Sequence, residues 1–306
     1  MRYGRPRGPW VDTALAKSAL SGSSGDAAST PPLLATVAQL IALTTWANAF
    51  LRKGFDPAGL NRDHATLKIC NKVAFADIRG LLKSREVPVA ADPLTWLKLL
   101  REEGCQAVRL LWFPRPDEGD GADAKEFEKD EPGWALECHR EGAVDHWRCR
   151  WELTNRYAPQ NRSWSVVYTR VERNIEPTAG KPVEFTEVRE RLSAALQECC
   201  AFANSHKQAA WEECLVKARS LLENPKPFDE SDHVQLLPRV GGTLTARQAL
   251  ACSLQALSCK PVAGASSQAD VDSDEGAATI QRLTETLHAA ITQSVEPAAN
   301  AWADGP

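Results

Sequence analysis

The sequence predicts an α+β protein, with N-terminal helices, an antiparallel sheet of about four strands, and a C-terminal helical hairpin with further helices. Three observations lead to this prediction. Apolar residues recur at helical spacing in the first and last parts of the chain. They alternate with polar residues between 134 and 172. The chain contains no repeat of solenoid length, so a repeat protein is not expected.

The composition excludes several classes of protein. The chain has 306 residues, of which 43% are apolar and 25% are charged. These values are ordinary for globular proteins and exclude collagen, a wholly disordered chain and a polytopic membrane protein. The formal net charge of −4 argues against nucleic-acid binding driven by global charge. We expect a flexible leader over 1–32, helices and sheet over 33–175, and a helical region over 183–306 packed on it, or one domain over 33–306.

The apolar stretch 33–52 predicts the first helix, because Leu33, Val37 and Leu40 follow helical spacing. Two alternatives are a signal segment cleaved near Ala47-Asn48-Ala49 and a membrane anchor. Acidic residues upstream weigh against the signal, and polar residues within the stretch weigh against the anchor. We therefore expect a core helix, no membrane span and a cytoplasmic protein, while the status of 1–49 as leader or signal stays open.

Two more helices are predicted before the sheet. Residues 61–83 present Leu67, Cys70, Ala74, Ile78 and Leu81 at helical spacing. Residues 93–103 follow Asp92 as N-cap and precede Gly104.

The predicted strands cover 107–113, 134–140, 145–153 and 164–172, and the acidic stretch 114–133 is expected to be a long loop. A two-residue turn at Gly142-Ala143 fixes the register of the middle hairpin. It places Trp134, Leu136 and Cys138 opposite Trp151, Cys149 and Trp147 on the apolar face. On the polar face, Glu137 then meets Arg148, and His139 meets His146.

The C-terminal part predicts a helical hairpin over 186–204 and 207–222, followed by helices over 245–259 and 276–295. Ser205 and Gln208 form a predicted capping box, and Gly241-Gly242 is read as a turn before an N-cap. The nine cysteines contain no CxxC pair and fall mostly in apolar patterns. They therefore indicate free thiols in a reducing cytoplasm, with Cys199 and Cys214 in the core.

Three parts of the chain carry a resemblance to known sequences, namely Asn61-Arg62-Asp63 through Lys83, the sheet from Trp134 to Tyr168, and Ala298-Ala299-Asn300. Together they resemble an uncharacterised bacterial protein family. It spans most of residues 55–302 and implies a bacterial, cytosolic protein. It carries no known activity and no known catalytic residues.

The polar face of the predicted hairpin is the main candidate site. Its residues are Glu137, His139, His146, Arg148, Arg150 and Arg162. The arginines favour an anion, such as a phosphate, a carboxylate or an acidic partner, over a metal ion. The alternative without a binding function is a solvated sheet face with cross-strand pairs. We expect no metal and no cofactor.

Two other groups of residues are weaker candidates. Asp270 to Gly276 resembles a calcium loop, but Glu275 stands where the loop needs glycine. Cys199-Cys200 with His206 and Cys214 is better explained by core packing than by a nucleophile. The common phosphate-binding, zinc-protease and serine-hydrolase motifs are absent from the sequence.

We therefore expect a soluble, non-enzymatic binding or accessory protein that recognises a protein partner or an anionic ligand. One alternative is an enzyme with His139 or His146 as base and Arg148 or Arg150 holding an anionic substrate. A second alternative is nucleic-acid binding through the arginine-rich sheet face. The sequence does not indicate an oligomeric state.

Overall fold

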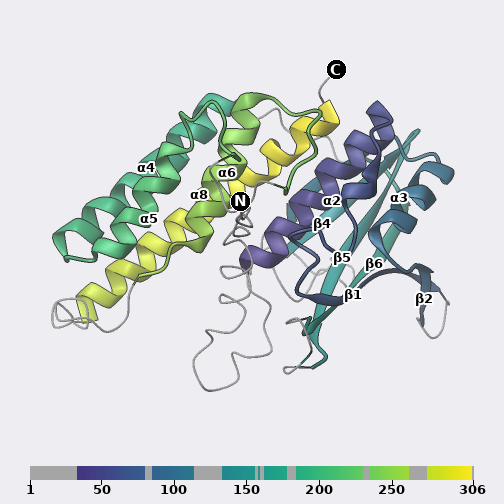
Figure 1. Ribbon diagram of the computed structural model, residues 1–306, viewed down its shortest axis with the longest axis horizontal. Coiled ribbons are helices and arrows are strands. Elements are labelled where there is room, and N and C mark those ends of the chain that lie inside the picture. The colour runs from purple at the N-terminus through teal and green to yellow at the C-terminus, as the bar shows by residue number, and fades with distance from the viewer. Residues whose placement is uncertain are drawn as a thin grey trace, which may run out of the picture.

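A six-stranded sheet with two helices on one face lies beside a layer of four helices (Figure 1). The computed structural model describes residues 33–79, 85–113, 133–155, 158, 162–177, 184–229, 235–261 and 274–304. One continuous hydrophobic core joins the sheet part and the helical layer. The α+β class is confirmed. The expected leader 1–32, the loop 114–132 and most of the calcium-like segment lie outside the described residues.

The sheet is larger than predicted and mixed. Its strands are β1 (Cys70–Arg79), β2 (Arg85–Ala90), β3 (Ala107–Phe113), β4 (Gly133–Arg140), β5 (Ala143–Leu153) and β6 (Trp164–Ile175). Their order across the sheet is β2-β1-β6-β5-β4-β3. Strands β1 and β6 are parallel, and the other neighbours are antiparallel. The strands predicted at 107–113, 134–140, 145–153 and 164–172 are confirmed, but β1 and β2 were missed.

The helix predicted over 61–83 is wrong, because this region contains turns followed by β1. Strand β1 lies between β2 and β6, and residues Val73 to Asp77 are all buried. A strand that is buried on both faces loses the alternation by which a strand is recognised. Its apolar residues then match a helical spacing equally well.

The register predicted for the β4–β5 hairpin is also wrong. Arg140 pairs with Ala143, so Glu141 and Gly142 form the turn, and Gly142 has a φ of 69°. Leu136 consequently faces Trp147 instead of Cys149, a shift of two residues. A shift of two keeps every side chain on its predicted face, because side chains alternate with a period of two. It changes only which residues meet.

Helices α2 (Leu33–Lys53) and α3 (Pro93–Glu102) cover one face of the sheet (Figure 1). Phe75 stacks between Trp96 of α3 and Tyr168, at 4.5 and 5.1 Å between ring centroids. Gln39 of α2 accepts a hydrogen bond of 2.8 Å from the Tyr168 hydroxyl. Both predicted helices are confirmed, including the Asp92 cap, which accepts from the backbone N–H of Thr95 at 2.8 Å.

Helix α2 is long and apolar enough to cross a membrane, but 89% of its most apolar window is buried inside the protein. A signal sequence would pass the same test of length and composition. In this structure α2 is a core element, and Ala47 and Asn48 of the signal-like motif are buried.

Two asparagine side chains form hydrogen bonds with the backbone groups at the outer edge of β3. The side-chain amide of Asn48, from α2, bonds both the N–H and the carbonyl of Val108, at 2.9 and 2.6 Å. Asn300, from α8 (Asp274–Asp304), does the same for Leu110, at 2.7 and 2.9 Å. Each amide supplies the donor and acceptor that a further strand would supply. The edge is therefore closed against pairing with another chain.

The helical layer contains α4 (Phe185–Ser205), α5 (Ala209–Ser220), α6 (Leu244–Ser258) and α8 (Figure 1). The predicted helices of this part are confirmed, although α8 extends beyond the predicted end. The predicted capping box is wrong, because Ser205 ends α4 and its hydroxyl donates to the Phe202 carbonyl. Gln208 occupies the N-cap of α5 without a side-chain cap bond.

The turn predicted at Gly241-Gly242 is confirmed, with Thr243 as N-cap of α6. Both glycines have positive φ, at 80° and 66°. A Cβ on Gly242 would lie 2.3 Å from the ring of Trp302. Only glycine fits this turn, because it combines a left-handed backbone with contact against a buried indole.

Candidate functional site

Three of the predicted site residues of the hairpin form a connected network with Glu172, on the sheet face away from α2 and α3. The buried carboxylate of Glu137 contacts Nε2 of His139 through one oxygen. Its other oxygen lies 3.0 Å from Nε2 of His146. The second ring nitrogen of His146 lies 2.6 Å from a carboxylate oxygen of Glu172. We call these four residues the histidine–glutamate network.

The pairings within the network differ from the predicted ones. His139 does not face His146, and Glu137 does not face Arg148, because His146 pairs with Glu137 and Val144 pairs with His139. The structure nevertheless brings both histidines onto one carboxylate. Glu172 was not predicted as a site residue, because a bulge in β5 at His146 sets its pairing with β6.

The charges of the network stabilise one another. Both ring nitrogens of His146 face carboxylates, an arrangement that the imidazolium form satisfies by donating twice. Burial lowers the pKa of His146, but the hydrogen bonds to Glu137 and Glu172 outweigh it and raise the pKa. Burial raises the pKa of Glu137, but the hydrogen bonds from His139 and His146 outweigh it and lower the pKa to about 2. Glu137 is therefore ionised at neutral pH.

The three predicted arginines have different surroundings. Arg150 binds both oxygens of Glu86, at 2.9 and 3.2 Å, and also contacts Glu152. Arg162 contacts Asp63 at 3.3 Å. Arg148 lies over the ring of Phe113, with its guanidinium carbon 4.9 Å from the ring centroid. The carboxylates beside Arg150 and Arg162 reduce the positive charge that this face offers to an anion.

A second ionic cluster lies on the helix-covered face and was not predicted. The side chain of Arg170 is fully buried and contacts three carboxylates, at 2.9 to 3.0 Å, with its guanidinium 4.5 Å from the centroid of the Trp147 ring. The carboxylates belong to Asp77, Glu103 and Asp145. We call these four residues the arginine cluster. It joins β1, β5 and β6 to the end of α3 and is structural in character.

The structure adds a pocket that the sequence did not indicate. Its volume is about 560 Å³, and it lies between the turns after α2, the start of β1 and the start of α3. Its apolar lining includes buried side chains, namely Leu60, Leu67, Cys70, Val73 and Pro93. Burial raises the pKa of the Cys70 thiol to about 12, so this sulfur contributes apolar surface and no nucleophile.

Three cations also line the pocket, namely Arg62, Lys72 and Lys98. The side chains of these three residues have no hydrogen bond and no ion pair within the described part of the chain. The single carboxylate of the lining, Asp92, uses both oxygens to cap α3 through the N–H and hydroxyl of Thr95. The start of α3 adds the positive end of its helix dipole. The lining of the pocket therefore carries an excess of positive charge, although the whole protein is acidic.

The wall of the pocket formed by residues 60–67 is held from behind. Gln39 donates to the carbonyl of Thr66 at 3.1 Å. The ring of His64 lies between the Thr66 hydroxyl and the Gln235 carbonyl, at 3.0 Å from each. Burial lowers the pKa of His64 to about 4, so the imidazole is neutral at pH 7 and is used in packing.

The residue patterns explain why the pocket was missed. Arg62 and Lys72 fall in the stretch that was interpreted as a helix, where they would be part of a solvated face. They approach Lys98 only because β1 pairs with β2 and α3 follows directly. No short motif marks such an arrangement.

Comparisons with protein-family models, with curated proteins and with solved structures find no match for this chain. The candidate sites therefore rest on the geometry of this chain. Within the described residues, no group of three or more His, Cys, Asp or Glu side chains could hold a metal ion. Three features of the described structure are therefore candidates for a functional site: the pocket, the histidine–glutamate network and the arginine cluster.

Proposed function

We propose that this protein is a binding protein for a small organic anion with an apolar body, held in the pocket between β1 and α3. The observation that carries the proposal is the set of three cations, without side-chain partners among the described residues, around a pocket of which half the lining residues are apolar. Charged side chains that are paired within a protein are satisfied without a ligand. Arg62, Lys72 and Lys98 have no such partner among the described residues.

The size and chemistry of the pocket support this ligand class. Its volume of about 560 Å³ lies within the range of roughly 300–1,000 Å³ that is common for small-molecule sites. The apolar lining suits an aromatic or aliphatic body. The anionic group, a carboxylate or a phosphate, would meet Lys72, Lys98 and Arg62 at the rim, where charge-assisted hydrogen bonds form.

The polar sheet face is a second place where a ligand or partner could bind. A protein partner, an anionic ligand or a nucleic acid could meet Arg148 and its neighbours there, but Arg150 and Arg162 already contact carboxylates. A role for His146 as a catalytic base would require it to leave Glu137 or Glu172. A ligand could enter the pocket without breaking any such contact, and this favours the pocket over the sheet face as the binding site.

The proposal is tested by isothermal titration with three eight-carbon probes, octanoate, octyl phosphate and octanol. We expect either anion to bind at least tenfold more tightly than octanol, a difference of about 1.4 kcal/mol. The order of the two anions distinguishes a carboxylate site from a phosphate site.

The matched variants are Lys72→Glu with Lys98→Glu, and Lys217→Glu with Arg219→Glu as a control of equal charge change on the exposed face of α5. We expect the first pair to abolish binding of the anions and the control pair to retain it. Equal affinity for the anions and octanol, or equal loss in both variants, would overturn the proposal.

A further inference from the structure

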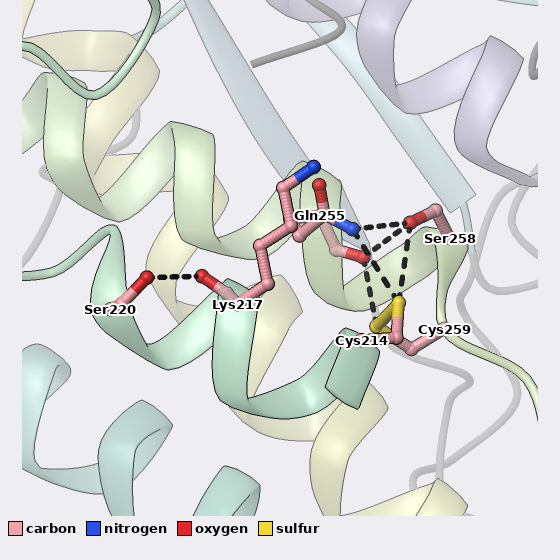
Figure 2. The surroundings of a disulfide bond; sticks show 6 residues. All are labelled: Cys214, Lys217, Ser220, Gln255, Ser258 and Cys259. Atoms are coloured by element: carbon pink, nitrogen blue, oxygen red, sulfur yellow. Dashed lines mark hydrogen bonds between the residues drawn. A yellow bond between two sulfur atoms is a disulfide. The ribbon is translucent and has the colours of Figure 1, made fainter. Parts of the chain in front are cut away.

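The nine cysteines fall into two groups. Seven are free thiols, and most of them are buried. Burial raises the pKa of Cys199 to about 11, as it does for several others, so these thiols are unreactive. Cys214 and Cys259 instead form a disulfide, with 5.6 Å between their Cα atoms (Figure 2). The prediction that Cys214 is a core thiol is therefore wrong.

The disulfide lies at the surface of the helical layer. Cys214 is in the middle of α5, and Cys259 directly follows the last residue of α6. Both residues are partly exposed, whereas the middle of α6 is fully buried, with Leu250 and Leu254 at 0% exposure. Core packing therefore holds most of α6, and the disulfide holds its C-terminal end against α5.

The surroundings of the two sulfurs are unequal. The side-chain amide of Gln255 donates to Cys214 Sγ at 3.4 Å (Figure 2). The Ser258 hydroxyl, 3.9 Å from the same sulfur, donates instead to the backbone carbonyl of Gln255 at 2.6 Å. That backbone carbonyl oxygen also lies 3.2 Å from Cys259 Sγ. Donors stabilise a thiolate, whereas a carbonyl oxygen and the C-terminal end of a helix destabilise it. Cys214 is therefore the better leaving group of the two.

We propose that Cys214–Cys259 is a reversible thiol–disulfide switch that releases the end of α6 from α5 when a dithiol of the thioredoxin class reduces it. Two observations favour a switch over a permanent crosslink. Seven cysteines remain thiols, which is the pattern of a chain that folds under reducing conditions. Both cysteine residues are partly exposed, so the disulfide lies where a reductant can approach it.

The reaction balances without a further reactant. A thiolate of the dithiol attacks Cys259 Sγ, the bond between the two protein sulfurs breaks, and its electron pair passes to Cys214, whose thiolate then takes up a proton. The second thiol of the dithiol, as thiolate, attacks the mixed disulfide and releases Cys259 as a thiolate, which is also protonated. The protein gains two thiols, and the dithiol becomes a disulfide.

The test is a redox titration of the full chain in buffers of reduced and oxidised glutathione, followed by alkylation and mass spectrometry. We expect the extent of alkylation of Cys214 and Cys259 to change together within the range of these buffers. Cys200, which is partly exposed and unpaired, is the control, and its alkylation should not follow that of the pair. Addition of thioredoxin should accelerate the reduction. Resistance to reduction both at every glutathione ratio and by reduced thioredoxin would show a permanent crosslink and overturn the proposal.

Hydrogen exchange supplies the structural readout. Reduction should increase the exchange rates of amides in the last turn of α6, around Gln255 and Ser258, by at least tenfold. The variant Cys214→Ser with Cys259→Ser should show the fast rates under all conditions, and Cys200→Ser should behave like the unmodified protein. Equal exchange in the oxidised and reduced protein, or free thiols at 214 and 259 under oxidising conditions, would contradict the switch.

Discussion

The charges within the sheet and the charges around the pocket differ in what surrounds them. The arginine cluster and the histidine–glutamate network are largely buried, and each charge contacts an opposite charge. The cations of the pocket are exposed and have no partner within the described residues. From this difference we infer that the first two sets stabilise the fold and that the third is available to a ligand. The following predictions test this division.

The largest effect is expected at Arg170. Replacement by Met removes the cation that the buried carboxylates of Asp77 and Asp145 share, while Arg173 remains 3.4 Å from Asp77 and Arg140 remains in contact with Asp145. Because these partners remain, we expect a loss of about 3 kcal/mol of unfolding free energy, the lower end of the range for a broken buried pair. Urea unfolding measures it, and Arg150→Met is the control, because its exposed ion pairs are worth about 0–1 kcal/mol. Equal losses in the two variants would remove the distinction between buried and exposed pairs.

A smaller effect is expected at His146. Replacement by Phe keeps a ring of similar size beside Phe113 but removes both donors to Glu137 and Glu172. Leaving a buried acceptor without its donor costs about 1–3 kcal/mol. The same unfolding experiment measures this loss. Arg148→Met is the matched control on this face, with an expected loss of about 0.5–1 kcal/mol from its contact with the Phe113 ring.

The pH dependence of stability should identify the network. The folded-state pKa of His146 is raised above 6.5, so its contribution is complete below that value and is lost as pH rises through the folded pKa. The pKa of Glu137 is lowered from 4.5 to about 2, so its contribution is present above 4.5 and is lost as pH falls toward 2. The network therefore contributes most between these limits.

This pH profile is measured by urea unfolding from pH 5 to pH 9. The unmodified protein should lose stability as the pH rises through the folded pKa of His146. His146→Phe should show a flatter profile over that range. If the two profiles ran parallel, His146 would not carry the pH dependence and the network would be a neutral hydrogen-bonded arrangement.

The smallest effect on stability is expected at the pocket. Lys72→Glu with Lys98→Glu breaks no ion pair of the described structure, so the unfolding free energy should change by about 0.5 kcal/mol or less per substitution. The affinity for octanoate or octyl phosphate should nevertheless fall at least tenfold. A destabilisation as large as that of Arg170→Met would place these lysines in the fold instead of a binding site.

Local patterns predicted the elements whose sequences carry a clear period. The helix at 93–102 has its Asp92 cap, and the strands at 133–140 and 143–153 alternate apolar with polar residues. Strand β1 was not predicted because its residues from Val73 to Ala76 are all apolar, whereas β4 is equally buried but keeps Glu137 and His139 on one face. The candidate site was predicted in part: Glu137, His139 and His146 do meet, but the register and Glu172 needed the bulge in β5.

Local periodicity and composition were enough to predict the α+β class, the order of most elements and the acidic net charge. The parallel pairing of β1 with β6, the pocket around Lys72 and Lys98, and the Cys214–Cys259 disulfide became visible only in the folded chain. Each of these joins segments that are distant in the chain or lie in different elements. Contacts of this kind are set by how whole elements pack, and no spacing within one element encodes them.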